Sequence, residues 1–121
     1  MKQVLVVDDS PVIRKIARRI LESLRVQTSE ACDGRQALEA CAVSMPDGIF
    51  VDSLMPVVDG FEFMRELRRM PDGEKPRLVF CTSEYDVAQI ARALHAGADD
   101  ILMKPFDREA VQSKFGALAA S

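Results

Sequence analysis

The segment Val4-Leu5-Val6-Val7-Asp8-Asp9 decides how this chain folds, because four consecutive apolar residues stop abruptly at two acids. The apolar run is largely β-branched and does not alternate with polar residues, which is typical of a strand buried on both faces. Ser10 and Pro11 follow as an N-cap and a first-turn residue, so a helix is predicted to begin there. A buried strand that leads directly into a helix indicates a parallel sheet covered by helices.

The rest of the chain repeats this strand and helix unit four more times. Further strands are expected near 26–31, 49–52, 78–82 and 101–103, and further helices near 34–43, 61–69, 87–94 and after 107. Apolar residues spaced by three and four predict the buried faces of the first and fourth helices, at Ile13, Ile16, Ala17, Ile20, Leu21 and Leu24, and at Val87, Ile90, Ala91 and Leu94. Five such units predict a doubly wound α/β fold with right-handed crossovers.

The composition is that of one domain with mixed charge. The chain has 121 residues, 48% of them hydrophobic, which is enough for one ordinary core and leaves no room for a second domain. Its 16 basic and 19 acidic residues argue against direct binding of nucleic acid. Cys32, Cys41 and Cys81 lack metal-binding spacing and are expected to be buried free thiols. Without a signal segment or a long apolar run, we expect a cytoplasmic protein with no membrane insertion.

Polar residues close four of the five predicted strands. Asp8 and Asp9 end the first strand, Asp52 the third and Thr82 the fourth, and Lys104 follows the fifth. If the first strand lies between the second and third, in the order 2-1-3-4-5, the three carboxylates converge at one edge of the sheet. Such a cluster needs positive charge. Mg²⁺ can supply it, because this ion prefers oxygen ligands and keeps positions open for phosphate, and Lys104 supplies a second cation.

Asp52 is the predicted nucleophile of this site. The chain has no glycine-rich phosphate loop, and aspartyl phosphate is an established covalent form. In a transfer to Asp52, Mg²⁺ and Lys104 would neutralise charge on the phosphoryl oxygens, and the Thr82 hydroxyl would donate to one of them.

Several short motifs occur together in the order and spacing of one known family. They are Asp8-Asp9, Asp52 with Met55-Pro56, Asp59-Gly60, Thr82-Ser83 and Lys104-Pro105-Phe106. Together they resemble the response-regulator receiver domain of bacterial two-component signal transduction, and the resemblance covers the whole chain. It implies a flavodoxin-like (βα)5 fold, with a five-stranded parallel sheet of order 2-1-3-4-5 and helices on both faces. It also implies a single receiver domain over residues 1–121, without an output domain, similar to chemotaxis regulators.

The resemblance assigns a role to each residue of the site. The implied Mg²⁺ ligands are Asp9 and Asp52 directly, Asp8 through a water molecule, and the main-chain carbonyl of Leu54. Asp52 would be the phosphorylation site, Thr82 would move toward the phosphoryl group, and Lys104 would pair with it. The peptide bond between Lys104 and Pro105 is expected to be cis.

The function implied by the resemblance is that of a stand-alone response regulator. It would accept a phosphoryl group from a histidine kinase or histidine phosphotransferase and then, as a monomer or weak dimer, bind an unknown downstream protein. It would be no enzyme, apart from catalysing its own phosphorylation and dephosphorylation. Alternatives are a phosphorelay shuttle or phosphate sink, and a binding module that works without phosphorylation. A phosphohydrolase of the haloacid-dehalogenase type is disfavoured, because its nucleophile would be followed by a second Asp two residues on.

The chain departs from the family pattern at Ile101 and at Ser83, where family members often have Ala or Gly. Ile101 replaces the usual aromatic switch residue three before Lys104, so coupling to the fourth helix is expected to depend on packing. Leu54 and Glu84 flank the path of attacking water, and a bulky apolar Leu54 is expected to lengthen the life of the phosphoryl group.

The predicted outer face of the first helix is basic. It carries Arg14, Lys15, Arg18 and Arg19. In the family this helix commonly docks the helical bundle of the donor, so the basic face is either such a docking surface or a plain solvated face.

Overall fold

Five strands alternate with five helices in the computed structural model, which describes residues 2–53, 55 and 58–119. The elements are β1 (Gln3–Val7), α1 (Pro11–Ser23), β2 (Gln27–Ala31), α2 (Gly34–Val43), β3 (Gly48–Asp52), α3 (Gly60–Arg69), β4 (Arg77–Thr82), α4 (Val87–Ala96), β5 (Asp100–Met103) and α5 (Arg108–Ala119). The predicted units are confirmed to within two residues wherever both ends were predicted. Within the described ranges, no helix is both long and apolar enough to cross a bilayer.

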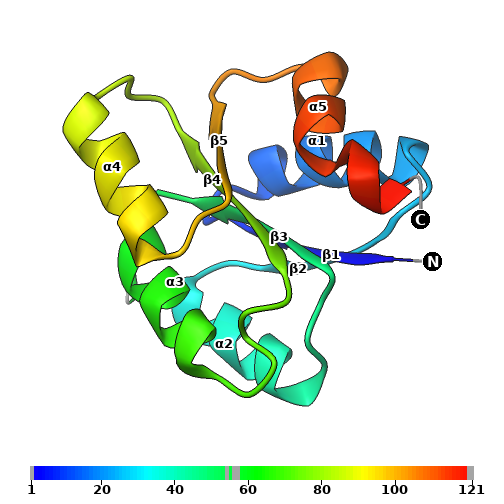
Figure 1. Ribbon diagram of the computed structural model, residues 1–121. Coiled ribbons are helices and arrows are strands. Elements are labelled where there is room, and N and C mark those ends of the chain that lie inside the picture. Colours follow the sequence, from blue (N-terminus) through cyan, green and yellow to red (C-terminus); the bar gives the residue numbers. More distant parts are fainter. Residues whose placement is uncertain (1, 54, 56–57, 120–121) are drawn as a thin grey trace.

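All five strands are parallel and lie in the order β2-β1-β3-β4-β5, which confirms the predicted topology (Figure 1). Val7 of β1 pairs with Val51 of β3, so the next residues, Asp8 and Asp52, lie side by side at the ends of these strands. Thr82 of β4 pairs with Met103 of β5, immediately before Lys104. The register therefore brings the polar strand ends to one edge of the sheet.

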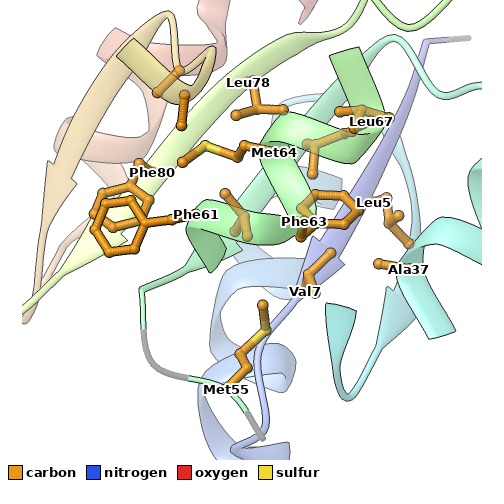
Figure 2. Close-up of a cluster of buried hydrophobic side chains, with 14 of the residues drawn as sticks. Leu5, Val7, Ala37, Met55, Phe61, Phe63, Met64, Leu67, Leu78 and Phe80 are labelled. Atoms are coloured by element: carbon orange, nitrogen blue, oxygen red, sulfur yellow. The ribbon is translucent and has the colours of Figure 1, made fainter. Parts of the chain in front are cut away.

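Helices cover both faces of the sheet. Figure 1 shows α2, α3 and α4 on one side and α1 and α5 on the other. On the first side, the α3 residues Phe63, Met64 and Leu67 are fully buried over the sheet, as Figure 2 shows. On the second side, Phe115 of α5 packs into a separate cluster with Phe50. The helices cover the faces of the sheet, so its carboxyl edge lies between the two layers.

The predicted buried face of α4 is wrong. This helix packs through Ala93 and Ala96, whereas Val87 and Leu94 are 75% and 49% exposed. Alanines at a spacing of three satisfy the helical period as well as the larger residues do, and their small side chains let α4 approach the core closely. Periodicity alone could not choose between the two faces.

Two further predictions of burial are wrong. Ile16 on α1 is 42% exposed, and the helix packs instead through Ala17 and Leu21. Cys32 is exposed because β2 ends one residue earlier, so this cysteine lies beyond the sheet. Cys41 and Cys81 are buried free thiols as predicted.

Arg68 ties two loops together at the opposite, amino edge of the sheet. Its guanidinium donates to the main-chain carbonyls of Gly73, Pro76 and Gly97 over 2.8–3.0 Å. It also contacts the Asp99 carboxylate at 3.1 Å. Because several carbonyls depend on this one side chain, Arg68 stabilises the α3–β4 and α4–β5 connections together.

Candidate functional site

Asp8, Asp9 and Asp52 meet at the carboxyl edge of the sheet. One carboxylate oxygen from each lies within 4.8 Å of the others. Asp8 is fully buried, Asp52 is 5% exposed, and Asp9 is exposed. The cluster is therefore open to solvent on the side of Asp9.

Asp8 is held by several hydrogen bonds. Its amide donates to the Ala31 carbonyl at 3.2 Å, and its Oδ1 accepts from the Ser10 amide at 2.9 Å. Ser10 in turn caps α1, because its hydroxyl accepts from the Ile13 amide at 3.3 Å. The predicted helix start thus also orients the first carboxylate of the site.

Lys104 provides the positive charge of the cluster. Its Nζ lies 2.8 Å from Asp52 Oδ1 and 3.0 Å from Asp8 Oδ2. Its amide donates to the Thr82 carbonyl at 2.8 Å, which places the side chain at the end of β5. The peptide bond between Lys104 and Pro105 is cis, as expected.

The charges of the site are unbalanced, since three carboxyl groups face one ammonium. Burial, with a further contribution from the neighbouring Asp8 and Asp9 charges, raises the pKa of Asp52 although Lys104 opposes it. Burial lowers the pKa of Lys104, but its hydrogen bonds to Asp52 and Asp8 outweigh that effect and leave it above its ordinary value. A second cation would relieve the repulsion among the carboxylates.

The donor set fits Mg²⁺. Three carboxylates offer only oxygen, the ligand atom that this hard cation prefers, and exposed Asp9 leaves access for water or phosphate. A hollow of about 480 Å³ opens beside Asp9, lined also by Ser53, Met55, Asp59, Phe61, Gln89 and Arg92. The predicted carbonyl ligand, Leu54, lies outside the described residues.

Thr82 ends β4 at the same edge and is buried. Its neighbour Cys81 pairs with Asp52 in the sheet register. The Thr82 hydroxyl oxygen accepts from the Glu84 amide at 3.2 Å, so its own hydrogen stays available for a donor contact. Thr82 can therefore serve as a neutral donor at the rim of the cluster.

The residues that depart from the family pattern or flank the water path differ in burial. Ser83 and Glu84 are exposed beyond β4, and the Glu84 carboxylate accepts from the side-chain amide of Gln89 at 3.2 Å. Ile101 is half-buried against the cluster that includes the α4 alanines. Packing-based coupling through Ile101 stays a prediction.

The basic face of α1 is only partly solvated. Arg14 and Arg18 both pair with Glu30 on β2, whereas Lys15 and Arg19 are exposed. Sequence reasoning missed the inward role of Arg14, because neighbouring basic residues such as Arg14 and Lys15 look alike in a charge pattern. An acid on the neighbouring strand was the signal that could have separated them.

Comparison with known proteins identifies relatives of one family. The family model described as response regulator receiver domain matches residues 4–115. Response regulator MprA of Mycolicibacterium vanbaalenii is 40% identical over 116 residues, which are 96% of this chain and 49% of that protein. MprA of Mycobacterium ulcerans is also 40% identical, with the same coverage. The chain thus spans about half the length of the curated relatives it matches.

Solved structures of similar proteins cover nearly the whole chain. Chemotaxis response regulator CheY4 of Vibrio cholerae matches with a TM-score of 0.91 and 30% identity, over 98% of both chains. The receiver domain of sensor histidine kinase PA1611 from Pseudomonas aeruginosa matches with a TM-score of 0.89 and 29% identity, over 99% of this chain and 98% of that one. That structure has a magnesium ion coordinated in its active site cleft.

Proposed function

Because this chain belongs to the response regulator receiver domain family, we propose that Asp52 accepts a phosphoryl group from a phosphohistidine donor, supported by Mg²⁺. The observation that carries the proposal is the contact between a nearly buried Asp52 and Lys104 Nζ at 2.8 Å, beside two further carboxylates. A carboxylate nucleophile flanked by an ammonium and a candidate metal site suits attack on phosphorus.

Each residue has a defined part in the proposed transfer. A carboxylate oxygen of Asp52 attacks phosphorus while the bond from phosphorus to the donor nitrogen breaks, and the histidine leaves with the bonding electron pair. Lys104 then exchanges its contact with Asp52 for one with a phosphoryl oxygen. The Thr82 hydroxyl donates to another of these oxygens.

Mg²⁺ would be held by Asp8, Asp9 and Asp52, with the main-chain carbonyl of Leu54 as a further ligand, and would neutralise charge on the phosphoryl oxygens. Asp9 is suited to direct binding because it is exposed and has no hydrogen bond or ion pair in the described part of the chain. Buried Asp8 is already engaged by Ser10 and Lys104, which suits a contact through water.

The proposed output is protein binding that depends on phosphorylation. The donor would be a histidine kinase or a histidine phosphotransferase in the cytoplasm, and the receiver would catalyse only its own phosphorylation and dephosphorylation. A phosphoryl group carries about two negative charges and strong acceptor oxygens, enough to draw Thr82 and Lys104 toward Asp52 and change the adjacent surface. The same chemistry would also serve a phosphorelay shuttle.

Incubation with Mg²⁺ and acetyl phosphate, followed by intact-protein mass spectrometry, tests the proposal. We expect a single phosphoryl adduct that disappears in EDTA and in Asp52→Asn. Asp72→Asn is the matched control, because Asp72 lies in an exposed turn with φ 63°, a conformation that asparagine also tolerates. An adduct that persists in Asp52→Asn would refute the assignment. No adduct in the parent, with Mg²⁺ bound, would favour a module that works without phosphorylation.

A further inference from the structure

Arg14 on α1 joins the main chain of the acidic site to β2. Its Nη1 donates to the carbonyl oxygen of Asp8 at 2.7 Å, and its Nε contacts the Glu30 carboxylate at 2.7 Å. The Arg14 side chain is only 15% exposed. Arg14 therefore makes structural contacts and does not belong to the solvated face of α1.

Glu30 is itself held in place from two sides. Arg18 also contacts the Glu30 carboxylate, and Arg18 Nε donates to the Thr28 hydroxyl at 2.9 Å. Hydrogen bonds from Arg14 and then Arg18 hold the pKa of Glu30 below its ordinary value. Glu30 therefore stays ionised at neutral pH and anchors the Arg14 guanidinium against β2.

The carbonyl that Arg14 binds belongs to the peptide unit between Asp8 and Asp9. Because a peptide unit is planar, fixing this carbonyl also fixes the direction in which the chain enters Asp9. Asp9 makes no hydrogen bond or ion pair among the described residues, so its main chain is what orients its carboxylate. The Asp8 side chain, in contrast, is held by Ser10 and Lys104.

We infer that Arg14 is a positioning residue for the Mg²⁺ site, which it keeps assembled by holding the Asp8–Asp9 peptide against β2 through Glu30. The inference rests on the proposed function, because it assigns Arg14 a part in that same site. Arg14 touches neither the phosphoryl group nor the metal ion in this role.

The direction in which Mg²⁺ affinity changes in Arg14→Ala distinguishes positioning from simple electrostatics. Arg14 carries a positive charge near a site for a cation, so through-space repulsion alone predicts that Arg14→Ala binds Mg²⁺ more tightly. Positioning predicts the opposite, because a misdirected Asp9 is a poorer ligand. Loss of an outer partner of a metal ligand typically costs about 10- to 100-fold in affinity, and we expect about tenfold here.

Titration calorimetry with Mg²⁺ compares the parent with Arg14→Ala and Arg14→Lys. Arg19→Ala is the matched control, because Arg19 is exposed on the same helix and has no ion pair within the described residues. We expect Arg14→Ala to bind Mg²⁺ about tenfold more weakly. Arg14→Lys should lose less affinity, since an ammonium can still reach one of the two partners. Arg19→Ala should bind like the parent or slightly more tightly.

The acetyl phosphate reaction adds a readout that a general loss of structure would not reproduce. In Arg14→Ala the Mg²⁺ concentration for half-maximal rate should rise by the same factor as the dissociation constant, while the rate at saturating Mg²⁺ stays near the parent value. A rate that remains low at saturation would overturn the positioning role, and so would parent-like or tighter Mg²⁺ binding.

Folding of each variant is checked by circular dichroism. Should Arg14→Ala fail to fold, Arg14→Lys decides the question, because parent-like Mg²⁺ affinity in that variant overturns the inference and weaker binding supports it. A parent that itself binds no Mg²⁺ would remove the proposed metal site and this inference together. Parent-like Arg14 variants, in contrast, would overturn the inference alone.

Discussion

Replacing Asp9 with asparagine should stabilise the protein when no divalent cation is present. The Asp9 carboxylate lies within 4.8 Å of those of Asp8 and Asp52, and no hydrogen bond or ion pair compensates it in the described part of the chain. Folding therefore brings this charge close to two like charges, and a neutral amide of the same shape removes that repulsion.

The magnitude follows from the geometry. At 4.8 Å two unit charges repel by about 1 kcal/mol in water and by about 3.5 kcal/mol at an effective dielectric constant of 20. Because Asp9 is exposed, we apply the lower figure to each of its two pairs, and attraction to the nearby Lys104 ammonium offsets one of them. We expect a net gain in the free energy of unfolding of about 1 kcal/mol, or roughly 4 °C in Tm for a domain of this size.

Urea unfolding in EDTA at low ionic strength measures this gain. The chain has no tryptophan and one tyrosine, so far-UV circular dichroism is the suitable signal. Glu66→Gln is the matched control, because Glu66 is exposed on α3 and has no ion pair within the described ranges. Its stability should stay within about 0.5 kcal/mol of the parent.

Saturating Mg²⁺ should reduce or reverse the difference in stability between Asp9→Asn and the parent. The parent gains about 2.7 kcal/mol at a Mg²⁺ concentration 100 times its Kd, whereas Asp9→Asn has lost a ligand and gains less. An Asp9→Asn protein that is no more stable than the parent in EDTA would refute the view that the three carboxylates repel one another. If Glu66→Gln gains as much stability as Asp9→Asn, the gain comes from the change in net charge alone.

Three further outcomes are expected. A thiol reagent should modify exposed Cys32 in the native protein, but Cys41 and Cys81 only on unfolding, because burial raises their pKa to about 11 and about 12; simultaneous reaction of all three thiols would contradict this. Arg68→Met should lower the free energy of unfolding in urea by about 3 kcal/mol, since it removes the donor to three partly buried carbonyls, and a loss below about 1 kcal/mol would contradict this role of Arg68. Glu30 has a lowered pKa in the folded protein, so the parent should be more stable than Glu30→Gln above pH 4.5, the ordinary pKa. This difference in the free energy of unfolding should vanish as pH falls through the lowered pKa, and a difference independent of pH would exclude the linkage.

The site could be predicted from the sequence to the extent that it depends on where strands end. Asp8, Asp52 and Thr82 close buried apolar runs, and the carboxyl ends of parallel strands share one edge. The pattern of a buried strand is local, so these residues could be found without knowing any contact between distant segments.

The packing faces of helices were less accessible to prediction. In α4 the residues Val87 and Leu94 and the alanines Ala93 and Ala96 both follow a helical repeat, yet only the alanines are buried. Hydrophobicity favours the larger residues, whereas the space over the sheet favours the smaller ones. That space is defined by side chains from other elements, which no local pattern contains.

The sequence by itself determined the α/β alternation, the strand ends and the residue types of the acidic site, because each depends on local hydrophobic runs and the polar residues that stop them. Only the tertiary structure decided that Arg14 turns inward to the Asp8 carbonyl while Arg19 on the same helix stays exposed. The difference arises because Arg14 faces Glu30 across the gap to β2, and a contact between residues 16 positions apart exists only once the sheet has formed.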